Sequence, residues 1–118
     1  MVSNAELKAA FDIMIAAKGS LADEGEKELE AKENLKNSES RILFTVDPKE
    51  LGSNEAIRQA SIRSRTQFEH ATLEKAELSK RKAALAFEIA CMKRDCLIWQ
   101  IRNEQASADC ESVGLGVI

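Results

Sequence analysis

Three cysteines and a single histidine are the side chains of this chain that zinc sites most often use, and the cysteines could also form disulfides. Cys91, Cys96 and Cys110 are odd in number, and no CxxC or HxxxH spacing brings two ligands together, so we expect neither a disulfide framework nor a zinc site. We interpret the cysteines as reduced thiols and expect Cys96 to be buried as a small apolar side chain. His70 is interpreted as a solvated or ion-paired residue. We predict no metal ion and no cofactor.

Short motifs of nucleotide-binding loops and hydrolytic sites are missing from the sequence, which lacks GxxxxGK[ST], GxGxxG, GxSxG and HExxH. Carboxylates are abundant, but they alternate with lysines, and no pair of them is set apart by an apolar environment. We therefore predict that the protein is not an enzyme and assign no catalytic residue. An enzyme with a site assembled at the interface of a helical bundle is the least favoured hypothesis.

Basic side chains in the second half of the chain could bind nucleic-acid phosphates, releasing the counterions that phosphates hold. Glu69, Glu74 and Glu77 interrupt this basic strip, and few aromatic residues lie near it, which weakens the hypothesis. Nucleic-acid binding is therefore the alternative function. Its candidate contacts are Arg58, Arg63, Arg65, Lys80, Arg81 and Lys82.

The composition of the chain favours long helices over a sheet. Of its 118 residues, 31% are charged and 4% are aromatic, with one proline and no tyrosine. Residues 1–46 carry a net charge of −3 and residues 55–106 one of +3, so helices formed by them would attract each other modestly. The N-terminus lacks a basic, apolar leader, and no apolar run approaches the ~18 residues of a membrane-spanning helix. We expect a cytoplasmic protein without membrane contact.

Apolar residues recur at heptad spacing in both halves of the chain. Residues at this spacing form one stripe on a helix, and the stripe must pack against another helix. We predict that the two stripes pack together, with the stems of Lys75 and Lys82 along their contact and the ammonium groups reaching carboxylates of the first helix. The first stripe comprises Leu7, Met14, Leu21, Glu28, Leu35 and Ile42, accompanied by Ala10, Ala17, Ala31 and Ser38. The second comprises Phe68, Ala71, Lys75, Leu78, Lys82, Leu85, Ile89, Met92, Cys96 and Trp99.

These patterns predict an all-α fold, an antiparallel hairpin of long, coiled-coil-like helices. The predicted single domain spans 1–107, with a helix over about 4–46, a connector at 47–54, a helix over about 55–107 and a loose tail at 108–118. Ser3 and Glu6 form a capping box at the start of the first helix. Gly19 and Gly25 each cost about 1 kcal/mol relative to alanine, so a bend near them is the main risk to a continuous helix.

The connector has its own local signals. Pro48 follows Asp47 at the first position of a helical turn, where its missing N–H costs nothing, and Gly52 ends that turn. The segment Leu51–Arg58 (LGSNEAIR) resembles a turn that opens a long charged helix in small uncharacterised helical proteins of bacteriophages and integrated mobile elements. The resemblance implies an accessory protein of a mobile element with no assigned reaction. It also implies that Asn54 and Arg58 organise the turn.

Counting outward from the connector, Leu7 should lie near Arg94 and Met14 near Phe87. The open end of such a hairpin carries more large apolar side chains than one helix–helix contact can cover, so we predict self-association into a homodimer or larger assembly with a four-helix bundle as its architecture. The main functional hypothesis is thus a self-associating coiled-coil protein that acts through protein contacts, with itself and with an unidentified protein partner. The predicted self-association residues are Phe11, Ile15, Phe87, Leu97, Ile98, Trp99 and Ile101.

Overall fold

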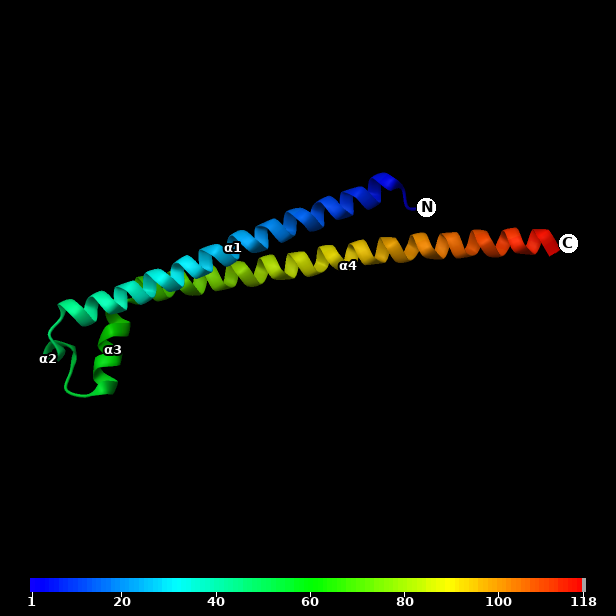
Figure 1. Ribbon diagram of the computed structural model, residues 1–118. Coiled ribbons are helices and arrows are strands. Elements are labelled where there is room, and N and C mark those ends of the chain that lie inside the picture. The colour runs from blue at the N-terminus through cyan, green and yellow to red at the C-terminus, as the bar shows by residue number, and fades with distance from the viewer. Residues whose placement is uncertain (118) are drawn as a thin grey trace. The chain divides into compact units, whose positions relative to one another are not determined.

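A computed structural model describes the backbone of residues 1–117 and the side chains of residues 1–108. The described residues form four helices and no strand: α1 (Asn4–Thr45), α2 (Pro48–Leu51), α3 (Glu55–Arg65) and α4 (Gln67–Val117) (Figure 1). α1 and α4 contain 42 and 51 residues, so well over two-thirds of the chain is helical. The all-α class and the antiparallel hairpin topology are confirmed.

The chain folds as two compact units, and α1 and α4 each contribute a segment to both. Unit 1 comprises Met1–Leu21 and Ala83–Ile118, and unit 2 comprises Ala22–Lys82. Within unit 1 the N–H of Val2 donates to Glu104 Oε1 at 3.3 Å, which places the start of α1 beside a late part of α4. Within unit 2 Ser38 Oγ donates to Glu69 Oε1 at 3.3 Å, which places the end of α1 beside the start of α4. In each unit the two segments therefore run antiparallel.

The first helix follows its predicted pattern closely. Ser3 Oγ accepts a hydrogen bond from the N–H of Glu6 at 3.1 Å, and α1 ends at Thr45, one residue before the predicted end. The predicted first stripe is its covered side, because every member of that stripe is at least partly buried. Neither Gly19 nor Gly25 interrupts the helix, since a glycine in a helix weakens it without breaking its hydrogen-bond ladder.

The connector is built by side chains that cap the two short helices. Asp47 Oδ1 accepts from the N–H of Lys49 at 3.0 Å, and Pro48 occupies the first turn of α2. Gly52 ends α2 with a φ of 149°, a conformation that residues with a Cβ atom rarely adopt. A Cβ atom at Gly52 would also collide with the Ile57 side chain. The turn therefore requires glycine at this position.

Asn54 and Arg58 both hold the start of α3, as expected from the sequence. Asn54 Oδ1 accepts from the N–H of Ile57 at 2.9 Å, which satisfies one of the free donors at the helix start. Arg58 Nε donates to the carbonyl oxygen of Gly52 at 3.2 Å and closes the turn from the other side. The guanidinium of Arg58 thus has a structural contact within the turn.

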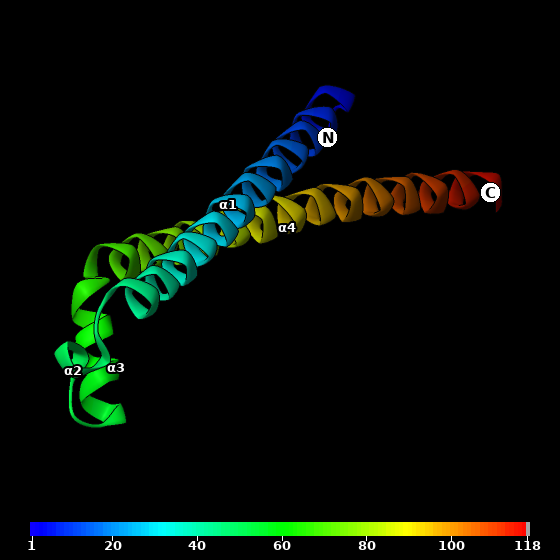
Figure 2. The ribbon, with the colours of Figure 1, turned by 60° about the vertical axis from the view of Figure 1, so that its left-hand side comes forward.

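The sequence predicted one continuous helix from residue 55, but the structure has two helices, α3 and α4, separated by a break at Thr66. There the backbone has φ −113° and ψ 24°, and its N–H is shared between the carbonyl oxygens of Ile62 and Arg63. The Thr66 hydroxyl also donates to Ile62 O at 2.8 Å, a bond of the kind that bends helices. Figures 1 and 2 show α3 turned away from the direction of the adjoining part of α4. Because Thr66 is fully buried, this bend is held by packing as well as by hydrogen bonds.

The pairing of the two long helices differs from the predicted one by one heptad. Arg94, expected near Leu7, donates to Met14 Sδ at 2.9 Å, and its guanidinium carbon lies 5.9 Å from the centroid of the Phe11 ring. A shift of seven residues keeps the heptad positions in step, so the stripe on α1 can be covered equally well in either alignment. Because the chain bends at Thr66, α3 does not continue the line of α4 alongside α1. Counting residues outward from the connector therefore does not give the observed alignment of α1 with α4.

The helix α4 extends beyond its predicted end near Ser107 and continues to Val117. The expectation of a loose tail is therefore wrong for the backbone of residues 108–117, while Ile118 lies outside the described residues. The segment contains two glycines but no proline. Adding a residue to an existing helix is far easier than nucleating one, and glycine costs only about 1 kcal/mol, so the helix continues.

Candidate interaction surface

One side of α4 contacts α1 within each unit. Lys80 Nζ lies 3.5 Å from Glu28 Oε2 in unit 2, and Arg94 contacts Met14 in unit 1. Phe87 and Ile101 continue the same heptad row, and all four α4 residues are partly buried. We call this row and its partly buried neighbours the inner side of α4. Its alanines are Ala76, Ala83, Ala84 and Ala90.

The opposite side of α4 carries a second apolar stripe that is exposed to solvent. On a helix of 3.6 residues per turn, this stripe lies about 180° from the row containing Lys80 and Arg94. The exposed fractions of Leu85, Met92 and Trp99 are 56%, 64% and 65%. We call this set the outer stripe; it comprises Leu78, Leu85, Ile89, Met92, Cys96 and Trp99.

The outer stripe is the one that the sequence predicted to pack against the first helix, so that prediction is wrong. Phe68 and Ala71, at its start, are also exposed. The physical reason lies in the inner side, whose alanines leave room for the large side chains of α1 such as Met14 and Leu35. α4 thus has apolar residues on two opposite sides, and α1 covers the side on which alanines alternate with larger residues such as Phe87 and Ile101.

The predicted self-association residues fall into two groups. Ile15 and Trp99 are exposed, with exposed fractions of 63% and 65%. The other five are partly buried within unit 1, and Phe11 lies beneath the Arg94 guanidinium. The structure therefore does not bring the seven residues together on one free surface. The partly buried group consists of Phe11, Phe87, Leu97, Ile98 and Ile101.

Lys75 and Lys82 are exposed, so their stems are not buried along the helix contact as predicted, although Lys75 lines a surface groove with Glu24 and Glu30 of α1. Lys80 takes the predicted role, because its stem is partly buried and its ammonium group pairs with Glu28. Glu28 also accepts from Lys32 at 2.8 Å, as the i,i+4 spacing indicates. The Lys32 hydrogen bond is the main influence that lowers the pKa of the Glu28 carboxyl, and the same contact raises the pKa of Lys32.

Of the six candidate nucleic-acid contacts, two are engaged within the chain. Arg58 closes the turn before α3, and Lys80 pairs with Glu28. The remaining four are exposed, two at the end of α3 and two on α4. The exposed four are Arg63, Arg65, Arg81 and Lys82.

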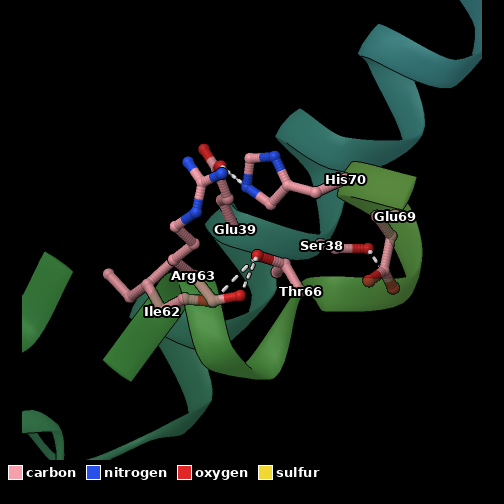
Figure 3. Close-up of polar contacts among 7 residues, drawn as sticks. All are labelled: Ser38, Glu39, Ile62, Arg63, Thr66, Glu69 and His70. Carbon is pink, nitrogen blue, oxygen red and sulfur yellow. Dashed lines mark hydrogen bonds and ion pairs between the residues drawn. The ribbon is translucent and has the colours of Figure 1, made fainter. Parts of the chain in front are cut away.

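A polar cluster joins α1 to the bend at Thr66 (Figure 3). His70 Nε2 lies 3.9 Å from Glu39 Oε1, and Ser38 donates to Glu69, so adjacent residues of each helix form the two contacts. The predicted ion-pairing role of His70 fits this geometry. Neither sequence spacing nor residue type singled out Thr66, because threonine on a helix is ordinary and only its complete burial marks the bend.

The thiols and the possible metal ligands occupy ordinary positions. Cys91 is partly buried, while Cys96 is exposed on the outer stripe and not buried as predicted; the side chain of Cys110 lies outside the described residues. Among the described side chains no three His, Cys, Asp or Glu residues gather closely enough to hold a metal ion. No helix among the described residues combines the length and apolarity needed to cross a bilayer.

Comparison of the chain with protein-family models, with curated proteins and with solved structures finds no match in any of the three.

Proposed function

We propose that this protein is non-enzymatic, that it self-associates through coiled-coil helix packing, and that it acts through protein contacts. The observation that carries the proposal is the outer stripe, a heptad row of large apolar side chains that the chain itself leaves uncovered. Contiguous exposed apolar surface of this kind marks a site of protein interaction. The resemblance of the turn at 51–58 to phage and mobile-element proteins supports a role as an accessory protein of such an element.

The small core supports the same proposal. Among the described residues, the apolar side chains that are nearly fully buried are Ala31, Leu51, Ile62 and Ala90, two of which are only methyl groups. Small domains are marginally stable because hydrophobic burial only narrowly exceeds the entropy lost on folding. A chain with so few buried side chains gains much from a second copy that covers more of its apolar surface.

The gain available from the outer stripe is of the size that association requires. Completely burying an exposed leucine, isoleucine or methionine contributes about 1.5–3 kcal/mol. Joining two chains costs an estimated ~4–15 kcal/mol in translational and rotational freedom. Because the stripe supplies six apolar side chains from each copy, its burial can exceed that cost.

The proposal is tested by light scattering on the purified protein and two double variants. We expect the wild type to be at least a dimer. Leu85→Glu/Met92→Glu should be monomeric, because each substitution places a charge in the interface. The matched control Ile13→Glu/Leu29→Glu adds the same charges at exposed apolar positions of α1 and should keep the wild-type mass. A monomeric wild type, or a dimeric stripe variant, would refute the proposal.

Nucleic-acid binding remains the alternative, because Arg63, Arg65, Arg81 and Lys82 are exposed. Binding through phosphates weakens steeply with salt, since counterions are released on complex formation. Titration of labelled single- and double-stranded DNA at low and moderate salt tests it, with Arg81→Glu/Lys82→Glu as the variant. We expect no binding; salt-sensitive binding that this variant abolishes would favour the alternative.

A further inference from the structure

We infer that a second copy of this chain covers the outer stripe, with the two α4 helices antiparallel and a two-fold axis passing near Phe87. This inference rests on the proposed function and adds the partner, the orientation and the alignment. α4 is one continuous helix, so positions at heptad spacing along it share a face. The outer stripe together with Lys75 and Lys82 supplies eight core positions, two from each of four consecutive heptads, a length typical of a coiled coil.

In the antiparallel alignment, each core position of one α4 helix faces a core position of the partner's α4 helix. In antiparallel coiled coils the first core position of one helix faces the second core position of the other. A two-fold axis near Phe87 makes every contact occur twice, as an isologous interface requires. The layers are Leu85 with the partner's Ile89, Lys82 with the partner's Met92, Leu78 with the partner's Cys96, and Lys75 with the partner's Trp99.

The two lysines favour this orientation over a parallel one. A parallel, in-register dimer would place Lys75 against the partner's Lys75 and Lys82 against the partner's Lys82, which brings like charges together in the core. The antiparallel dimer instead places Lys75 beside the partner's Trp99, where a cation–π contact is favourable. Lys82 lies beside the partner's Met92, so that its stem covers apolar surface while its ammonium group reaches solvent.

The charged residues beside the outer stripe also favour the antiparallel alignment centred near Phe87. They pair Arg81 with the partner's Asp95 and Glu74 with the partner's Arg102, and each pair forms twice. All four side chains are exposed in the isolated chain, although Asp95 also accepts a hydrogen bond from Arg94 at 2.8 Å. Only Glu88 meets a like charge, the partner's Glu88 at the axis.

Other alignments lose these pairs. A slip of one heptad in one direction would place Arg81 against the partner's Arg102 and Glu88 against the partner's Asp95, which are like charges. A slip in the other direction would keep Arg81 near an acidic residue, the partner's Glu88, but would place Glu74 against the partner's Asp95. A parallel dimer gains Glu88 with the partner's Lys93 but retains the two lysine contacts in its core. Charge complementarity therefore identifies both the occupant of the stripe and its direction.

Disulfide trapping tests the alignment, in a background of Cys91→Ser/Cys110→Ser that leaves Cys96 as the single thiol. Adding Leu78→Cys should produce a covalent dimer on oxidation, because residue 78 faces the partner's Cys96. Within one chain these positions lie about 27 Å apart along the helix, too far for a disulfide. The background should remain monomeric on a denaturing gel, and so should the matched variant carrying Leu85→Cys.

Each other result has a separate meaning. Covalent dimers in the background would show a parallel helix pair, and covalent dimers with Leu85→Cys would show the one-heptad slip; both overturn the inference. A dimeric mass with no cross-link in any variant would place the interface elsewhere, which overturns the inference but leaves self-association intact. A monomeric mass under reducing conditions would contradict the proposed function itself.

A charge swap provides a test without cysteines. Glu74→Arg and Arg102→Glu should each raise the dimer dissociation constant several-fold at low salt, and the combined variant should restore the wild-type value. Only the inferred alignment pairs residues 74 and 102. Single variants without effect, or a double variant weaker than either single one, would overturn the alignment.

Discussion

At the scale of single residues, the Thr66 hydroxyl links the bend between α3 and α4 to the packing around it. The hydroxyl donates to Ile62 O at 2.8 Å, and the residue is fully buried. Thr72 makes the same kind of bond to Phe68 O at 2.9 Å, but its side chain is exposed. The two threonines therefore differ mainly in burial, and an unmet buried hydrogen bond costs more than an exposed one.

Replacing Thr66 with valine should lower the free energy of unfolding by about 0.5–1.5 kcal/mol, because the buried Ile62 O loses the hydroxyl donor and keeps only the Thr66 N–H. The matched Thr72→Val change should matter much less, since water can replace the lost bond there. Urea denaturation followed by circular dichroism measures both values. Equal effects of the two substitutions would show that burial at Thr66 does not strengthen the bend.

Glycine substitutions separate permissive positions from the one that the turn requires. A Cβ atom at Gly19 or Gly25 would meet nothing within 4 Å, so Gly25→Ala should stabilise α1 by about 0.5–1 kcal/mol. Gly52→Ala should destabilise the protein, because the positive φ and the Ile57 side chain both oppose a Cβ atom. Thermal unfolding gives the signs, and a destabilising Gly25→Ala would contradict the continuous α1 helix.

At the scale of elements, the sequence predicts the structure where its signals are local. The caps at Ser3, Asp47 and Asn54 were predictable because each side chain bonds to a backbone group two or three residues away. The covered stripe of α1 was predictable because that helix has one dominant heptad row. The bend at Thr66 was not predictable, since it depends on tertiary burial and no glycine or proline marks it.

The two sides of α4 show what a heptad pattern leaves open. Both sides carry large apolar residues, and the unbroken 3-4 spacing of the stripe that contains Leu85 and Trp99 suggested the wrong side for α1. Periodicity gives the face of each stripe but not which neighbour covers it. It also leaves the alignment uncertain by seven residues, because such a shift restores the same pattern. This is why five of the seven predicted self-association residues proved partly buried within the chain.

At the scale of the whole molecule, a small buried core is combined with an uncovered apolar stripe. The chain buries few side chains within its described residues and presents six apolar ones along the outside of α4. A second copy on the outer stripe would make its folding depend on protein concentration, as in obligate dimers. The unfolding temperature of the wild type should therefore rise with protein concentration, whereas that of Leu85→Glu/Met92→Glu should not.

Whether the outer stripe is the self-association surface can be measured through the fluorescence of Trp99. It is the sole tryptophan of the chain and belongs to the stripe, with 65% of its surface exposed in the isolated chain. Emission and mass should be measured together across a dilution series, with Leu85→Glu/Met92→Glu as the reference for the monomer. We predict that wild-type emission is blue-shifted at high concentration and moves to the wavelength of the reference as the mass falls to that of one chain. An associated wild type whose Trp99 emission equals that of the monomer would contradict the claim.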